Sequence, residues 1–215
     1  TVMIPNSSLN KDVRFLNLVQ AIKFVYASTF SRNAKNYIEQ AGNRIEEEKM
    51  GIILQELVGK KYGNYFYPHF SGVARSYNYY PFGKAKPKDG IVNLALGLGK
   101  HIVDGGIGLQ YSPEYPGVYP QFAKTNDFFK KSQTKFWALD LNSDLVRKEP
   151  SEERHLSYLD LNISENHGTM RYLSSTYSSE NDMLYEGISR KGPRILNFAP
   201  ILKSKVIPLN DILKL

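Results

Sequence analysis

The stretch GIVNLALGLGKHIVDGG, residues 90–106, decides the fold class expected for this chain. Residues 91–97 are apolar enough for a buried strand, which Gly97 and Gly99 then interrupt. Lys100 follows at once, and a strand that ends in glycines before a basic residue often meets phosphate. The pattern is neither G-x-G-x-x-G nor a P-loop. The residues alone therefore leave two readings open, a nucleotide loop and a tight turn between core elements.

Two helices are expected before this strand, within residues 9–42. Residues 9–29 and 31–41 both carry apolar side chains at three- and four-residue spacing, which is typical of helices. The candidate capping residues are Ser8 or Asn10 for the first helix, Ser31 for the second, and Gly42 at the C-terminal stop.

From about residue 50 onward the pattern predicts a sheet. The expected strands are residues 50–58, 70–80, 91–97, 136–142, 158–164, 169–177 and 194–199. A hairpin around Gly63 is expected to join the first two strands, and residues 110–135 form a long irregular connection. Helices followed by strands predict an α+β fold with a mostly antiparallel sheet and packed helices, unlike the alternating elements of a dinucleotide-binding fold.

Composition limits the functions that this chain can have. The 215 residues include no cysteine, which excludes disulfides, thiolate catalysis and cysteine-based zinc sites. The four histidines are scattered without zinc-site spacing, and no nucleophile elbow occurs. No apolar run is long enough to cross a membrane. The net charge of +7 suits an anionic partner or an ordinary basic surface.

Two further segments have alternative interpretations. In LQELVGKK, residues 54–61, Glu56 interrupts an apolar run and either reaches solvent on an edge strand or meets a donor such as the adenine amine. In residues 66–88, tyrosines alternate with basic residues. That pattern is found in single-strand nucleic-acid platforms, but tyrosine also fills twisted sheets.

Four segments taken together resemble one family. YASTFSRNAKNYIE (26–39), MGIILQELVG (50–59), FSGVARSYNYYP (70–81) and IVNLALGLGKHIVDGG (91–106) follow the order of motifs in phosphoenolpyruvate synthases and pyruvate, phosphate dikinases. The similar part is their N-terminal nucleotide-binding domain, which has an ATP-grasp fold. The resemblance covers about residues 20–110 and is looser beyond them.

The resemblance implies a nucleotide site. It places Gln55, Glu56, Leu57 and Val58 against adenine, Ser71, Gly72 and Val73 alongside, and Gly97, Leu98, Gly99 and Lys100 near the adenosine end. Lys100 stands where the family has Glu. The implied cofactors are ATP and Mg²⁺, and no catalytic residue or metal ligand is expected within these residues. The implied reaction of the parent protein is ATP-dependent phosphorylation of an enzyme histidine, followed by conversion of pyruvate to phosphoenolpyruvate.

We therefore expect residues 1–215 to be a fragment of one ATP-grasp domain, inactive alone, from a cytoplasmic kinase whose other partners are pyruvate and the remaining domains. The acceptor substrate and the oligomeric state stay open. Two alternatives remain, a nucleotide-binding regulatory module without catalysis and a basic, tyrosine-rich nucleic-acid-binding module. The second alternative, which we do not favour, would be supported by Tyr77, Tyr79 and Tyr80 lying on one exposed sheet face, and would fail if they were buried.

Overall fold

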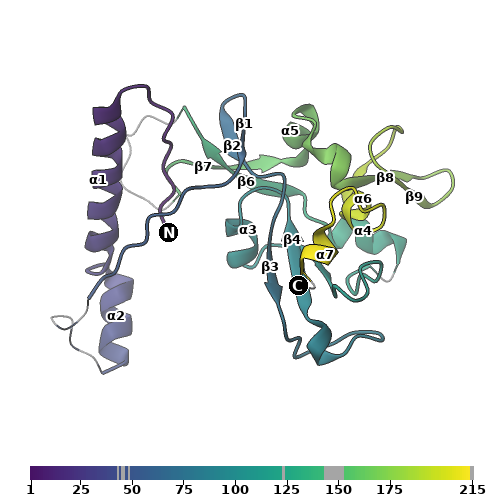
Figure 1. Ribbon diagram of the computed structural model, residues 1–215, viewed down its shortest axis with the longest axis horizontal. Coiled ribbons are helices and arrows are strands. Elements are labelled where there is room, and N and C mark those ends of the chain that lie inside the picture. Colours follow the sequence, from purple (N-terminus) through teal and green to yellow (C-terminus); the bar gives the residue numbers. More distant parts are fainter. Residues whose placement is uncertain (43, 45–46, 48, 123, 143–152, 214–215) are drawn as a thin grey trace. The chain divides into compact units, whose positions relative to one another are not determined.

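The computed structural model describes residues 1–42, 44, 47, 49–122, 124–142 and 153–213. Its contacts divide the chain into two compact units. Unit 1 consists of Thr1–Phe66 and Leu139–Ser157, and unit 2 consists of Tyr67–Ala138 and Tyr158–Leu215. Figure 1 shows the helices and strands of both units. Within the described part of the chain, no helix combines the length and the apolar character that crossing a membrane requires.

Unit 1 begins with the two expected helices, α1 (Lys11–Ser28) and α2 (Arg32–Gln40). The Asn10 side chain accepts a hydrogen bond from the Asp12 amide at 2.8 Å, so Asn10 rather than Ser8 caps α1. Ser31 caps α2 in the same way, through the Ala34 amide. The prediction of both helices and of their N-terminal caps is confirmed.

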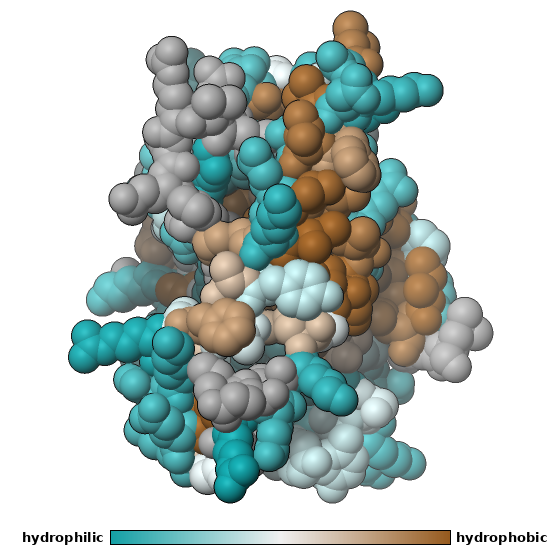
Figure 2. Space-filling view, turned by 90° about the vertical axis from the view of Figure 1, so that its left-hand side faces the viewer, coloured by the Kyte–Doolittle hydropathy of each residue, from teal (hydrophilic) through white to brown (hydrophobic). Residues whose placement is uncertain are grey.

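Helix α1 buries none of its residues. Its apolar side chains lie on all sides, and Phe15 is 64% exposed. Figure 2, which views the molecule from the side of α1, shows a band of apolar side chains between polar ones. In α2 the one buried residue is Ile38. The described part of the chain thus leaves much of the apolar surface of α1 uncovered.

Residues 50–58 do not form the expected strand. They have no regular secondary structure and pair with no described strand, and Ile53 is 90% exposed. The hairpin lies further along, where β1 (Lys60–Tyr62) turns through Gly63 (φ +56°) into β2 (Tyr65–Tyr67). Strand β1 is at the edge of its sheet and neighbours β2 alone. The apolar residues 50–58, which precede β1, therefore pair with none of the described strands.

This sheet has four strands in the order β1-β2-β6-β7, with β6 spanning Lys135–Asp140 and β7 spanning Leu156–Asp160. Within unit 1, β2 pairs with β6 in an antiparallel register that sets Tyr65 opposite Asp140.

Unit 2 contains two three-stranded antiparallel sheets. One has the order β3-β4-β5, from Ser71–Arg75, Ile91–Ala95 and Leu109–Tyr111. The other has the order β10-β8-β9, from Arg194–Leu196, Ser174–Ser178 and Met183–Glu186. The helices of unit 2 are α3 (Lys100–Val103), α4 (Thr125–Lys131), α5 (Leu161–Asn166), α6 (Ala199–Leu202), α7 (Leu209–Leu213) and the 3₁₀ helices η2 (Pro87–Asp89) and η3 (Thr169–Tyr172). The predicted α+β class is confirmed.

Several expected strands are shorter than predicted. Strand β3 stops at Arg75 because Asn78 forms a local turn, in which its side chain accepts the Tyr80 amide at 3.0 Å. The runs 158–164, 169–177 and 194–199 each contain a helical segment, namely α5, η3 and the start of α6. The connection expected to be irregular, residues 110–135, includes the end of β5 and all of α4.

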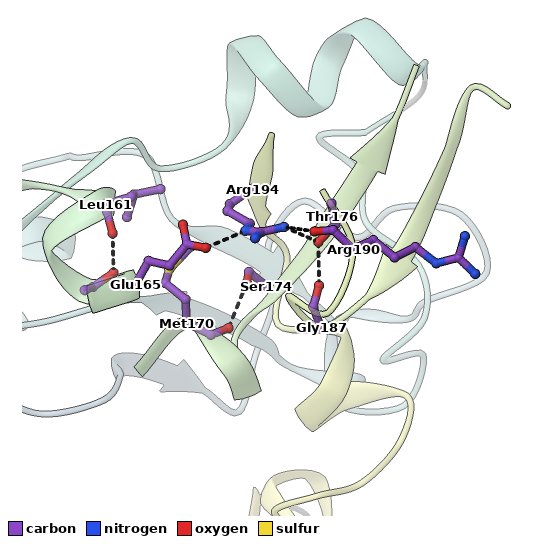
Figure 3. A network of polar contacts seen from close by, with 9 residues as sticks. Leu161, Glu165, Met170, Ser174, Thr176, Gly187, Arg190 and Arg194 are labelled. Atoms are coloured by element: carbon purple, nitrogen blue, oxygen red, sulfur yellow. Dashed lines mark hydrogen bonds and ion pairs between the residues drawn. The ribbon is translucent and has the colours of Figure 1, made fainter. Parts of the chain in front are cut away.

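Arg194 of β10 is at the centre of a network of polar contacts beside the β10-β8-β9 sheet (Figure 3). Its Nε donates to Glu165 at 2.8 Å, and one terminal nitrogen donates to the Thr176 hydroxyl at 2.6 Å and to the Arg190 carbonyl at 2.7 Å. The guanidinium therefore ties α5, β8 and the loop before β10 together with charge-assisted hydrogen bonds.

Candidate functional site

Gly97 makes a tight turn against the chain's own backbone. Its φ is +82°, and a Cβ at this position would lie 2.7 Å from the Trp137 carbonyl oxygen and 2.8 Å from Cδ2 of Phe136. The Leu98 amide donates to that same carbonyl at 3.0 Å. Gly97 and Leu98 are thus buried against β6, so the first glycine of the motif serves packing.

Gly99 has different surroundings. It precedes α3 with an ordinary helical conformation, and the nearest atoms to a Cβ there are Cβ and Oγ of Ser71, both at 3.9 Å. Ser71 Oγ is buried and has no hydrogen-bond partner among the described residues. A Cβ at Gly99 would thus only touch Ser71, and the nearby Ser71 hydroxyl is a buried group whose hydrogen bonding is incomplete among the described residues.

Gly72 and Val73 lie in β3, opposite Leu94 and Asn93 of β4. A Cβ at Gly72 would lie 2.7 Å from the Asn93 carbonyl oxygen. The glycine thus allows close pairing of β3 with β4, and this pairing brings Ser71 next to the turn that contains Gly99.

Lys100 stands where the family that the sequence resembles has glutamate. Its side chain interacts with two neighbours. Its ammonium pairs with Asp104 at 2.5 Å and lies 5.2 Å from the centre of the Trp137 ring. Tyr158 also packs on Trp137, with a distance of 4.7 Å between the ring centroids. Sequence reasoning missed this aromatic support, although Trp137 is the chain's single tryptophan and offers a signal.

Gln55, Glu56, Leu57 and Val58 belong to unit 1, whereas the other predicted site residues belong to unit 2. Val58 is 80% exposed, and no backbone hydrogen bond of these four residues with another described residue occurs. The amide and carbonyl groups of this segment, which has no regular secondary structure, are therefore unpaired with respect to the described residues. Such a segment can bind the polar edge of a base.

Among the described residues, no group of three or more His, Asp or Glu side chains could hold a metal ion. Burial lowers the pKa of His155 and of His167, which favours their neutral forms. Nδ1 of His167 lies 2.9 Å from the Tyr67 hydroxyl. The expectation that these residues include no metal ligand stays a prediction.

Tyr77, Tyr79 and Tyr80 are exposed, but they follow β3 in a loop instead of lying on a sheet face. The rings of Tyr77 and Tyr79 pack edge to face at 4.9 Å. The arrangement on a sheet face that would support the nucleic-acid alternative is therefore not observed, although the three side chains are exposed.

Comparison with known proteins identifies the family. The model of the family described as "Pyruvate phosphate dikinase, AMP/ATP-binding domain" matches residues 7–186. The chain belongs to this family. No curated protein and no solved structure matches it.

Family membership confirms the resemblance found in the sequence and the ATP-grasp-like character of the α+β fold. The chain thus contains the AMP/ATP-binding domain of the pyruvate phosphate dikinase family. The structure accounts for the packing role of Gly97, and the nucleotide-binding role of the turn stays a prediction.

Proposed function

We propose that this chain binds the ATP used by a phosphoenolpyruvate synthase-type enzyme, which phosphorylates one of its own histidines and then converts pyruvate to phosphoenolpyruvate. The observation that carries the proposal is the match of residues 7–186 to an AMP/ATP-binding domain, and the buried Ser71 hydroxyl beside Gly99, which lacks a partner among the described residues, supports it. The remaining domains of the enzyme supply the pyruvate site and the acceptor histidine.

Each unit, taken by itself, offers groups that suit one part of a nucleotide. In unit 1, the backbone of Gln55–Val58 makes no hydrogen bond with another described residue and suits the donor and acceptor edge of adenine, and the exposed Val58 offers an apolar contact. In unit 2, Ser71 Oγ lies next to Gly99 and suits a hydroxyl group of a ligand. Hydrogen bonds of this kind orient a ligand and give it specificity.

The contribution of this chain to the reaction is binding and orientation. ATP supplies the phosphoryl group that is transferred, and magnesium in this proposal arrives with the triphosphate, because the described residues do not fit a protein-held metal. Because the ammonium of Lys100 is already paired with Asp104, we propose that Lys100 stabilises the turn and does not contact the triphosphate.

Calorimetric titration of the 215-residue chain with adenosine and, separately, with Mg-ATP tests the proposal. We expect both ligands to bind with similar affinity. Gly99→Val should weaken both, since the larger side chain fills the space beside Ser71. Val58→Asp should weaken both by placing a charge against adenine.

Gly117→Val is the matched control. Nothing lies within 4 Å of a Cβ at Gly117, and its φ is not in the left-handed region. The proposed site is wrong if neither ligand binds at millimolar concentration, or if Gly117→Val weakens binding as much as Gly99→Val.

A further inference from the structure

We propose that unit 2 carries a second binding site, for a small ligand with a phosphate group, at the end of the β3–β4 pair opposite to Gly99. This site is additional to the proposed nucleotide site. It is a cavity of about 500 Å³, called the distal cavity below. Its lining includes Arg75, Lys88, Asp89, Gly90, Val92 and Glu114.

The ionisable side chains of the distal cavity that lack a partner among the described residues are positively charged. The side chains of Arg75 and Lys88 make no ion pair or hydrogen bond with any described residue. Asp89 is already engaged, since its Oδ2 accepts the Lys86 amide at 2.7 Å, and Glu114 also has an interaction of its own. A guanidinium and an ammonium that lack partners favour an anion.

The wall of the distal cavity is held by backbone packing. Gly90 has φ +70°, and a Cβ there would lie 2.6 Å from the Arg75 carbonyl oxygen. Arg75 is also paired with Ile91 in the β3–β4 register, and the Ser112 hydroxyl donates to the Asp89 carbonyl at 3.3 Å. The backbone at Arg75 and Asp89 is therefore fixed before a ligand arrives, which lowers the entropic cost of binding.

The distal cavity is separate from the space at Gly99. The register sets Ser71 opposite Ala95 at one end of the strand pair and Arg75 opposite Ile91 at the other. Four residues of a strand span about 13 Å. A compact ligand in the distal cavity therefore does not occupy the space beside Ser71, and the two sites can be filled together.

The ligand class follows from these groups. The planar guanidinium of Arg75 suits two oxygens of a phosphate group, and the ammonium of Lys88 adds a second charge. The volume fits a small molecule, and buried Val92 supplies an apolar contact for its carbon skeleton.

The experiment is calorimetric titration of inorganic phosphate into the 215-residue chain, with and without saturating adenosine, which itself carries no phosphate. Arg75→Gln and Lys88→Gln should each weaken phosphate binding by about tenfold or more. Both side chains are exposed, and circular dichroism verifies that the variants are folded. Adenosine should leave phosphate binding unchanged.

Lys84→Gln is the matched control, because it removes the same charge from an exposed position of the same loop outside the cavity lining. The proposal is overturned if phosphate does not bind, if Lys84→Gln weakens binding as much as Lys88→Gln, or if adenosine displaces phosphate. The adenosine titration reports separately on the proposed nucleotide site, so failure of one proposal is distinguished from failure of the other.

Discussion

Replacing each glycine of the Gly97-Leu98-Gly99 turn with alanine should have different consequences. Gly97→Ala puts an alanine at φ +82°, which costs about 1–2 kcal/mol. Its Cβ would also lie 2.7 Å from the Trp137 carbonyl oxygen, and backbone cannot move aside as a flexible side chain does. Overpacking of this kind costs about 1–3 kcal/mol more. We expect the free energy of unfolding to fall by about 2–5 kcal/mol.

The same substitution at Gly99 should be nearly neutral for stability. Gly99 has φ −59° and ψ −17°, and its nearest neighbours lie at 3.9 Å, an ordinary van der Waals distance. We expect the free energy of unfolding to change by less than about 0.5 kcal/mol. Because the added methyl points toward Ser71, adenosine binding should weaken even though the fold is intact.

Urea unfolding measured by tryptophan fluorescence suits this pair of variants, since the single tryptophan, Trp137, packs directly on the turn. A loss below about 1 kcal/mol in Gly97→Ala would contradict the packing argument. Equal losses in the two variants would show that the glycines have the same role. Unchanged adenosine binding in Gly99→Ala would instead count against the ligand space beside Ser71.

Three further predictions concern unit 2. Arg194→Ala should lower the free energy of unfolding by about 2 kcal/mol in urea titrations, because it leaves Glu165 and the Thr176 hydroxyl without their donor. Burial lowers the pKa of His167, so the unfolded chain binds a proton at this histidine more readily than the folded chain. The free energy of unfolding should therefore fall as the pH decreases below about 6.5, the ordinary histidine value, and through the lowered pKa. His167→Gln should flatten this part of the dependence of stability on pH. Tyr111→Phe should leave the free energy of unfolding within about 0.5 kcal/mol of wild type or raise it, since the fully buried Tyr111 hydroxyl has no hydrogen-bond partner among the described residues. A loss above about 1 kcal/mol in thermal or urea unfolding would contradict this reading.

Local signals in the sequence were enough to predict α1 and α2. Capping by Asn10 and Ser31 involves residues two or three positions away, so the chemistry is visible in a short window. Strand β4 was predictable for a similar reason, because its apolar run ends in Gly97. Residues 50–58 have a comparable run, but a strand also requires a partner, and no short window reveals whether one exists.

The sequence LDLN, which occurs at residues 139–142 and 159–162, shows which local signal was overlooked. Both predicted strands were extended through it, yet β6 ends at Asp140 and β7 ends at Asp160. The Asp140 side chain accepts the Asn142 amide at 2.9 Å, and Asp160 precedes α5 at its N-cap position. At Asp140 this local hydrogen bond favours a turn, whereas the Asp160 side chain makes no capping bond and marks the start of α5 by its position alone.

The candidate site was less predictable than the fold elements because it depends on distant contacts. The sequence motif makes Gly97 and Gly99 look equivalent. Their difference arises from Trp137 and Ser71, which come from other strands and contact one glycine each. The free cations of the distal cavity were equally hidden, since a lysine-rich loop does not show which side chains lack partners.

The division of unit 1 into two stretches of sequence has a consequence during synthesis on the ribosome. Phe66 of β2 pairs with Leu139 of β6, so roughly seventy residues must be added after β2 before its partner exists. At about 5–20 residues per second this delay lasts several seconds, during which the β3–β4 hairpin can already form. The chain order therefore lets a local hairpin of unit 2 form before the long-range strand pair that joins the two stretches of unit 1.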